Sequence, residues 1–199
     1  MEWVFVSILS YLFGSVPFSY IIPKWWKGVD VRKTGSGNVG ATNVIRNVGT
    51  GVGALCLFLD AMKGFLPVFI TRSLFGEPKL VALAAITAVL GHDFPVFLKF
   101  KGGKGVSSSF GVVIALSWLL GLIFAAVWTV LVFVTKYASV GSLTALYLSA
   151  VLGFLILGYD AGMLVLILAV LSTLRHSENI QRLARGEEKK VELFKRWRK

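Results

Sequence analysis

Long apolar runs constrain this chain more strongly than any other feature of its sequence. They cover residues 1–23, 106–135, 140–159 and 162–174. Helices of roughly 18 or more apolar residues match an ~30 Å hydrocarbon layer. With 56% hydrophobic residues and a mean hydropathy of +0.76, the 199-residue chain has more apolar surface than a soluble domain of this size can bury. The sequence therefore predicts an all-α membrane protein.

The first apolar run has the charge pattern of a retained helix. A secretory signal carries positive charge before its apolar core and small residues at a cleavage site. Here Glu2 precedes the run, and Pro-Lys-Trp-Trp-Lys, residues 23–27, follows it. Lysine and tryptophan are typical of the membrane–water interface. We expect an uncleaved first helix whose N-terminus lies outside the cell.

The positive charges predict how the helices are oriented. All but three of the 21 Lys and Arg residues lie within residues 24–46, 99–104, 136 and 175–199. The positive-inside rule favours placing all four segments in the cytoplasm. This requires one crossing before the first segment and a pair of crossings between neighbouring segments. We therefore expect one domain over residues 1–199 with about seven transmembrane helices, the N-terminus outside and the C-terminus cytoplasmic.

The run at residues 106–135 is short for two crossings, because it spans only ~45 Å as a helix. A tight turn at Gly121 between two short, tilted helices would accommodate two crossings. A single crossing would instead give five or six helices and would place Lys136 outside the cell.

Charge and composition exclude several functional classes. The net charge of +11 fits anionic lipid headgroups, whereas nucleic-acid binding would need a basic soluble module that the sequence lacks. The tail at 187–199, with Leu193, Phe194 and Trp197, is typical of a short interfacial helix. Cys56 is the only cysteine and the carboxylates do not cluster, so we expect no disulfide, metal or cofactor. No obligate protein partner is indicated.

Residues 34–49, TGSGNVGATNVIRNVG, carry the letters of a dinucleotide-binding loop. Gly35, Gly37 and Gly40 give G-x-G-x-x-G, and Asp60 follows in the position of a ribose-binding acid. That motif works only within a βαβ unit. Here a membrane helix precedes the loop and Asp60 lies in the next apolar run, so the context excludes an NAD site.

Residues 99–109, KFKGGKGVSSS, form a second glycine-rich loop. It is not a Walker A loop, because Leu98 and Gly105 occupy the positions that need Gly and Ser or Thr. Exposed N–H groups, a helix N-terminus and the Lys104 ammonium together suit an anion. The alternative is a flexible turn whose lysines only follow the positive-inside rule.

Other polar residues are expected on the same membrane face. They are Ser36, Asn38, Thr42, Asn43 and Arg46 in the first loop, Ser139 and Ser142, and His176, Asn179, Arg182 and Glu188 in LRHSENIQRLARGEE, residues 174–188. Each alone fits capping or a turn, but together they indicate a site for more than one anionic group. Asp60 and Lys63 are expected to form an ion pair in the membrane. His92 is either a helix-packing or a catalytic residue.

Four segments resemble, in order and separation, the signatures of the bacterial membrane-integral acyl-phosphate:glycerol-3-phosphate acyltransferases, the PlsY family. They are SGNVGATN with Arg46, LDAMKG, GHDFPVFLKFKGGKGV and HSENIQRLARGEE. The resemblance covers essentially the whole chain. It implies transfer of a fatty acyl group from acyl phosphate to the 1-hydroxyl of glycerol 3-phosphate, giving lysophosphatidic acid and phosphate. It also implies the first acylation of phospholipid biosynthesis, among membrane lipids of the bacterial cytoplasmic (inner) membrane, with the active site facing the cytoplasm.

The resemblance also implies roles for individual residues. One group would cradle a phosphate mainly through backbone N–H groups: Ser36, Gly37, Asn38, Gly102, Gly103 and Gly105. A second would hold the other phosphate by charge and side-chain hydrogen bonds: Arg46, Lys104, Ser142, His176 and Asn179. A third would shape the first loop: Gly40, Ala41, Thr42 and Asn43. Glu188 would anchor Arg182 or another cation, and Lys104, His176 and Asn179 are the expected catalytic residues.

Two questions of mechanism stay open at this point. Direct attack by the substrate hydroxyl is the simpler hypothesis, because no nucleophile is paired with an oriented base. The proton would then pass to His176 or to a substrate phosphate. A transporter of a small phosphorylated metabolite or anion is the alternative function, but it would gather its cations near the membrane midplane between inverted repeats.

Overall fold

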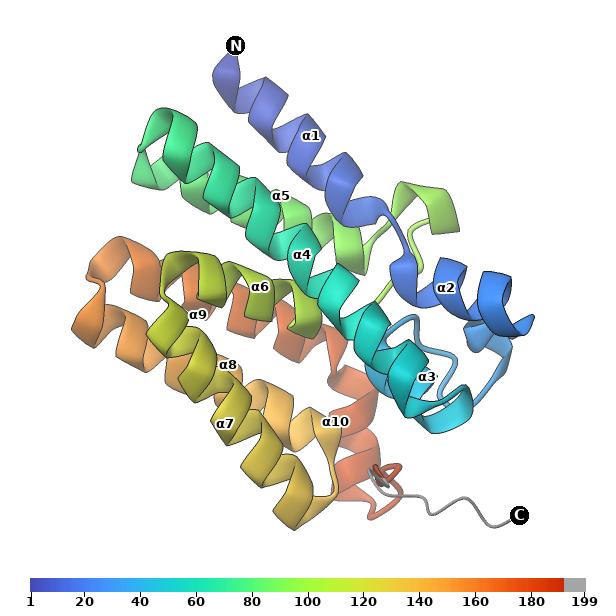
Figure 1. Cartoon of the computed structure of the whole chain (residues 1–199). Helices are drawn as coiled ribbons and strands as arrows, with labels where there is room; N and C mark the ends of the chain where they lie inside the picture. Colours follow the sequence, from blue (N-terminus) through green and yellow to red (C-terminus); the bar gives the residue numbers. More distant parts are fainter. Residues whose placement is uncertain (192–199) are drawn as a thin grey trace.

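The computed structural model describes residues 1–191, and this part of the chain is helical without strands, which confirms the all-α class (Figure 1). The longer helices are α1 (Glu2–Ser15), α2 (Phe18–Lys27), α4 (Thr50–Phe75), α5 (Pro78–Asp93), α6 (Val106–Leu116), α7 (Trp118–Thr135), α8 (Ala138–Ile156) and α9 (Tyr159–Arg175). The shorter ones are α3 (Ala41–Asn47), α10 (Ser177–Ala184) and the 3₁₀ turns η1 (Val31–Lys33) and η2 (Val96–Leu98). Leu193, Phe194 and Trp197 of the expected interfacial helix lie outside the described residues, and residues 187–191 are not helical.

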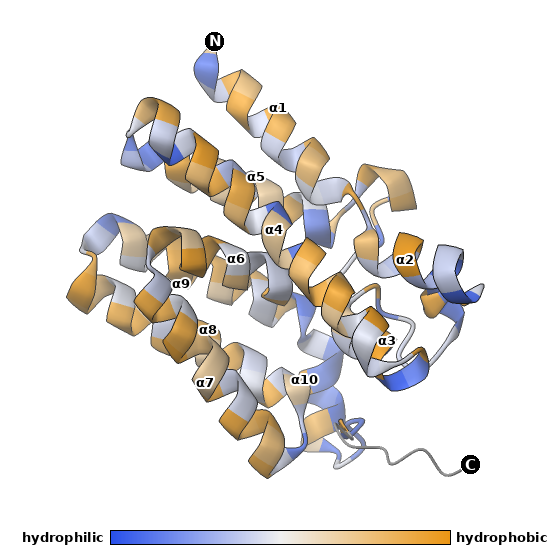
Figure 2. Ribbon diagram, viewed as in Figure 1, coloured by the Kyte–Doolittle hydropathy of each residue, from blue (hydrophilic) through white to orange (hydrophobic). Residues whose placement is uncertain are grey.

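Within residues 1–191, five helical segments are long and apolar enough to cross a membrane: α1 with α2, α4, α5 with η2, α7, and α8. The bent pair α9 and α10, with 62° between its axes, gives a sixth. Helix α6 is apolar but shorter. If α6 also crosses the membrane, the total is seven crossings. The number seven stays a prediction. Hydrophobic residues, coloured orange in Figure 2, predominate along most of these helices.

The run at 106–135 is divided into α6 and α7 at Ser117, so the expected turn at Gly121 is wrong. Ser117 has an extended backbone, and its hydroxyl accepts a hydrogen bond from Leu120 N, at 3.4 Å, as the N-cap of α7. Gly121 instead allows close packing, because a Cβ there would lie 2.5 Å from Ile114 Cγ1. The capping preference of serine decides the position of the break.

The cation-rich segments gather at one end of the bundle. In Figure 1, α2, α3, α10 and the α7–α8 turn lie toward the lower right, whereas the N-terminus and the α4–α5 and α8–α9 turns lie toward the upper left. This is the grouping expected from the positive-inside rule. Which end faces the cytoplasm stays a prediction.

Close helix contacts position the loops at this end. A Cβ on Gly64 of α4 would lie 1.9 Å from Ser108 O of α6, and one on Gly111 of α6 would lie 1.9 Å from Ala61 O. Small residues let the two backbones touch, as is common between membrane helices. The α4–α6 contact therefore fixes the start of α6, and the glycine-rich loop before it, against α4.

A buried polar cluster joins α4 to the break between α1 and α2. The expected ion pair is present: Lys63 Nζ lies 2.8 Å from Asp60 Oδ1, and both side chains are almost fully buried. Ser19 Oγ donates to Asp60 Oδ2 at 2.6 Å, and Lys63 Nζ donates to Val16 O at 2.8 Å. The pair is stabilised inside the bundle because these further hydrogen bonds accompany it.

Candidate active site

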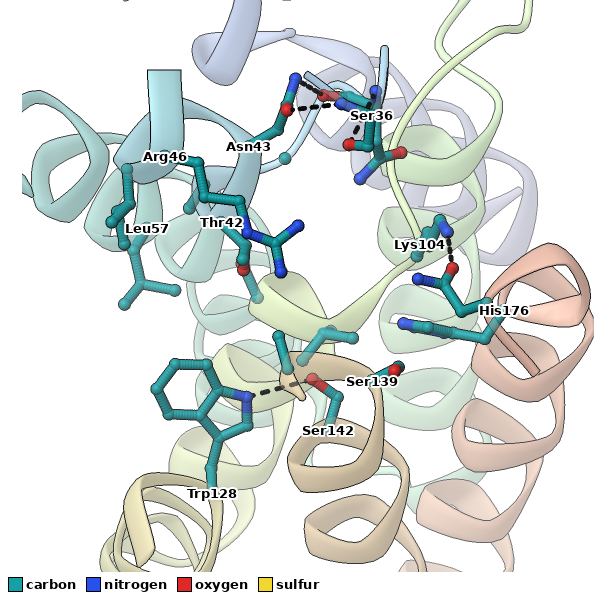
Figure 3. A pocket seen from close by; sticks show the side chains of 18 of the residues that line it. Ser36, Thr42, Asn43, Arg46, Leu57, Lys104, Trp128, Ser139, Ser142 and His176 are labelled. Carbon is teal, nitrogen blue, oxygen red and sulfur yellow. Dashed lines mark hydrogen bonds between the residues drawn. The ribbon is translucent and has the colours of Figure 1, made fainter. Parts of the chain in front are cut away.

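A cavity of ≈ 260 Å³ lies among the cation-rich segments. Of the residues that the sequence singled out as site residues, all but four line it; the exceptions are Gly37, Gly102, Gly103 and Gly105. Figure 3 shows Arg46 on one side of this cavity and Lys104 and His176 on the other. Part of its lining is apolar and includes Leu57, Phe110, Phe124 and Trp128. The cavity therefore offers cations and an apolar surface to one ligand.

Asn43 organises the first glycine-rich loop, as expected. Its buried amide nitrogen donates to the carbonyl oxygens of Val31, Thr34 and Asn38, at 2.9–3.2 Å. Its amide oxygen accepts from Ser36 N at 3.0 Å. A buried amide with this many partners rigidifies the backbone around it. One side chain thus holds the loop in the shape that presents Ser36 and Asn38 to the cavity.

The backbone N–H groups of this loop are used differently from the expectation. Ser36 N donates to the Asn43 side chain, and Gly37 N donates to Thr34 O at 2.9 Å. Both donors are therefore satisfied within the protein and are not left for a ligand. Side chains, not glycine N–H groups, are what the loop presents to a ligand. Gly37 is required for its left-handed backbone, with φ of 71°.

The backbone N–H groups of the second glycine-rich loop also differ from the expectation that they bind phosphate. Gly102 N donates to Asp93 O at 3.2 Å, and Gly103 N donates to His92 O at 3.1 Å. A Cβ on Gly102 would lie 2.2 Å from His92 O, and one on Gly103 would lie 2.0 Å from His92 Nε2. These glycines let the loop pack on the end of α5, and Gly105 takes the left-handed φ of 74° before α6. The loop's contribution to the cavity is the side chain of Lys104.

Lys104 faces the last turn of α9 and the start of α10. Its Nζ donates to Asn179 Oδ1, and Asn179 Nδ2 in turn donates to Glu188 Oε1 at 2.5 Å. Burial, reinforced by the Arg182 charge, lowers the pKa of the Lys104 amine from its ordinary value. A phosphate placed beside this amine would favour its charged form.

His176, which follows the last residue of α9, has a defined tautomer. Its Nδ1 lies 2.7 Å from Ser172 O, and a carbonyl oxygen can only accept, so Nδ1 carries the proton. Burial, helped by the Lys104 charge, lowers the pKa of the imidazole to about 4, so the ring is neutral near pH 7. Its Nε2 is then a free acceptor on a residue that lines the cavity. The ring can accept a proton or a hydrogen bond there.

Glu188 holds the polar side of the cavity together. Arg182 Nε donates to Glu188 Oε2 at 2.9 Å, so the expected ion pair is present. Ser139 Oγ donates to Glu188 Oε1 at 3.4 Å. This carboxylate therefore orients cations and amides, and Arg182 is already neutralised by it.

Arg46 and Lys189 connect the segment at 185–191 to the first loop. Arg46 Nη2 donates to Lys189 O, and Lys189 Nζ donates to Gly35 O, each at 2.7 Å. Arg46 Nε is buried and has no hydrogen-bond partner within residues 1–191. A buried donor without a partner is costly, so an anion in the cavity would satisfy it. Arg46 is thus poised to contact a ligand.

Sequence reasoning missed Lys189, Trp128 and Arg175. Lys189 follows Glu188 in a run of charges that resembles any solvated tail. Trp128 lies in a uniformly apolar run, and its Nε1 donates to Ser142 Oγ at 3.0 Å, which positions the Ser142 hydroxyl. Arg175 binds backbone carbonyl oxygens of the second loop, which carry no sequence signature. Of the three, only Arg175 lies within a segment that the sequence had marked as part of the site, residues 174–188.

His92 lies at the rim of both the cavity and the buried Asp60 cluster. Its Nδ1 is 3.9 Å from Asp60 Oδ1 and has no hydrogen-bond partner within residues 1–191. Its carbonyl oxygen holds Gly103 N. The contacts of the side chain therefore support neither interpretation over the other, and both stay predictions. No group of three or more possible metal-ligating side chains occurs in the described part of the chain.

Known proteins match this chain over nearly its whole length. The family model described as glycerol-3-phosphate acyltransferase matches residues 4–186. A Thermotoga petrophila protein named glycerol-3-phosphate acyltransferase is 66% identical over 196 residues, which cover 98% of this chain and 100% of the relative. A Thermotoga maritima protein named glycerol-3-phosphate acyltransferase 2 is also 66% identical over 196 residues, with the same coverage.

Two solved structures are similar to this one. The crystal structure of PlsY (YgiH), an integral membrane glycerol 3-phosphate acyltransferase, in its glycerol 3-phosphate form, has a TM-score of 0.89 and 41% identity, with 96% of each chain covered. Its lysophosphatidic acid form has the same TM-score and 39% identity, with 97% of each chain covered.

Proposed function

The chain belongs to the glycerol-3-phosphate acyltransferase family, and we propose that it moves a fatty acyl group from acyl phosphate to the 1-hydroxyl of glycerol 3-phosphate. The products are lysophosphatidic acid and inorganic phosphate. The reaction would be the first acylation of bacterial phospholipid synthesis, in the cytoplasmic membrane, with the cavity open to the cytoplasm. The single observation that carries the proposal is one cavity that combines several cations with an apolar wall.

The charge of the cavity supports two phosphorylated substrates. Its described lining contains Arg46, Lys104, Arg182 and Lys189, but Glu188 is its only carboxylate. Because Glu188 neutralises Arg182, three cations stay available to ligands. Glycerol 3-phosphate and acyl phosphate would each bring a phosphate to them. The apolar residues Leu57, Phe124 and Trp128 would accommodate the start of the acyl chain.

Direct transfer is the mechanism that these residues support. The 1-hydroxyl oxygen attacks the acyl carbon, an ester bond forms, and the bond from that carbon to the phosphate oxygen breaks. Lys104 stabilises the negative charge that develops on the carbonyl and on the departing phosphate. The hydroxyl proton passes to His176 Nε2 or to a substrate phosphate, whose second pKa of about 6 suits it. Asn179 orients Lys104.

A reconstitution experiment tests the donor. Purified protein in lipid vesicles receives labelled glycerol 3-phosphate with palmitoyl phosphate, and palmitoyl-CoA serves as the alternative donor. We expect turnover with palmitoyl phosphate as the donor and none with palmitoyl-CoA. The products should be lysophosphatidic acid and inorganic phosphate in equal amounts. Turnover with palmitoyl-CoA only would refute the acyl phosphate donor. Label that enters the vesicles without any ester product would favour the transporter.

A second experiment tests direct transfer. The protein is mixed with palmitoyl phosphate alone, quenched, and weighed as the intact chain. We expect no added acyl group. Ser142 Oγ accepts a hydrogen bond from Trp128 Nε1, and among the described residues no oriented base is paired with this hydroxyl to activate it as a nucleophile. A stoichiometric adduct that is converted to product on adding glycerol 3-phosphate would contradict direct transfer.

A further inference from the structure

Arg175 ties the second glycine-rich loop to two helices. Its Nε and Nη2 donate to Gly103 O at 3.2 and 3.0 Å, and Nη2 also donates to Asp93 O at 3.2 Å. The guanidinium lies over the Phe94 ring, 4.7 Å from its centroid. One side chain at the end of α9 thus joins the end of α5 to the loop before α6. The planar arrangement of donors in arginine is what allows these contacts together.

The backbone is held on both sides of Lys104 by the same turn of α9. Arg175 binds the carbonyl of the preceding residue, Gly103, and Ser172 Oγ donates to Lys104 O at 3.0 Å. The same turn carries His176, whose Nδ1 donates to Ser172 O. The backbone of Lys104 and the ring of His176 are therefore held by one rigid element.

Arg175 differs from the other arginine and lysine residues around the site. Arg46, Lys104, Arg182 and Lys189 line the cavity, whereas Arg175 lies outside the described lining. Its Nε and Nη2 groups donate to backbone carbonyl oxygens of the second glycine-rich loop and of Asp93, so these donors hold the backbone and not a phosphate. We propose that Arg175 is a positioning residue, which fixes Lys104 relative to His176 for acyl transfer. The inference rests on the proposed function, since positioning is measured by turnover.

Removing the guanidinium leaves the loop attached. Gly102 N and Gly103 N still bond to the carbonyl oxygens of Asp93 and His92. The peptide group before Lys104 would gain freedom without unfolding of the protein. Misplacement of a reacting group by about 1 Å can lower the rate about 10²-fold. The effect is expected on kcat, because the role that we assign to Lys104 is to stabilise the charge that develops during transfer.

The test compares Arg175→Lys with Arg72→Lys. Arg72 also donates to backbone carbonyls, those of Ala115 and Leu116 at 3.3 and 3.2 Å, but at the α6–α7 break away from the cavity. We expect Arg175→Lys to lower kcat about 10²-fold with the KM for glycerol 3-phosphate nearly unchanged. Arg72→Lys should change kcat by no more than about twofold. A kcat of Arg175→Lys close to wild type in folded protein, or a rise in KM alone, would overturn the proposal.

A double-mutant cycle isolates the route through Lys104. If Arg175 acts by placing Lys104, then Arg175→Lys should lower the residual kcat/KM of Lys104→Ala by less than about threefold. Equal losses in both backgrounds would show that Arg175 acts by another route and would refute the proposal.

A measurement independent of turnover separates this inference from the proposed function. The rate at which an amine-reactive ester labels Lys104, read by peptide mass spectrometry, should rise severalfold in Arg175→Lys and stay unchanged in Arg72→Lys. An unchanged rate in Arg175→Lys would contradict the positioning role. Failure of wild-type protein to use either acyl donor would refute the proposed function, whatever the labelling shows.

Discussion

Lys104 brings a positive charge into a cavity whose only described lining carboxylate is Glu188. Replacing it with alanine would remove the cation that we assign to the developing charge. We expect Lys104→Ala to lower kcat/KM by about 10²–10³-fold. Lys104→Arg should restore only part of this, because a planar fork does not reproduce a compact ammonium beside Asn179.

The matched control for Lys104 is its neighbour Lys101. Lys101 lies on the same loop but is exposed and outside the described cavity lining. Lys101→Ala should keep wild-type kcat/KM. Near-normal kcat/KM for Lys104→Ala in folded protein would remove Lys104 from the phosphate site, and equal losses in both variants would point to a general charge effect.

His176 makes a prediction about pH. A lowered pKa favours the neutral ring, so the acceptor form of His176 predominates at every pH above about 4. We therefore expect kcat, measured with saturating substrates, to show no loss from imidazole protonation between pH 8 and pH 5. Any decline of kcat near pH 6 should come from protonation of the substrate phosphate. It should therefore persist in the His176→Gln variant. A decline near pH 6.5 that His176→Gln abolishes would contradict this assignment.

Contacts between helices depend on glycines whose roles differ within a single element. In α4, Gly64 touches the backbone of α6, whereas nothing lies within 4 Å of a Cβ on Gly51. Gly64→Ala should destabilise the protein by about 1–3 kcal/mol through overpacking. Gly51→Ala should be neutral or slightly stabilising, since alanine is the better helix former. The midpoint of thermal unfolding in detergent measures the effect of each variant. Equal midpoints for Gly64→Ala and Gly51→Ala would contradict the close α4–α6 contact.

The helical elements followed from the sequence because membrane spans need long apolar runs, but the details of the loops did not. The break at Ser117 depended on a side-chain cap, and the expected turn at Gly121 was wrong. The N–H groups of Gly37, Gly102 and Gly103, which were expected to bind phosphate, instead donate to nearby carbonyl oxygens. A glycine pattern indicates a tight backbone but does not identify the partner of each N–H group.

At the scale of the whole molecule, the sequence predicted which segments meet and not how they are held. Positive charge alone placed residues 24–46, 99–104 and 175–199 on one membrane face, and each of these segments contributes residues to the cavity. The supporting contacts of Arg175 and Lys189 are made to backbone oxygens, which every residue possesses. The roles of Arg175 and Lys189 therefore depend on three-dimensional proximity, and no residue pattern in the sequence predicts them.

Topology is the remaining prediction for the whole molecule. The cation-rich segments gather at one end of the bundle, opposite the N-terminus (Figure 1), and the positive-inside rule places such an end in the cytoplasm. A reporter that is active only in the cytoplasm should work when fused to the C-terminus and fail when fused to the N-terminus. Moving the reporter to the α4–α5 turn at Gly76, on the side of the N-terminus, should also silence it. Equal results at the two termini, both active or both silent, would require an even number of crossings and would contradict the seven-helix prediction; silence at both is the result expected if α6 and α7 together cross the membrane only once.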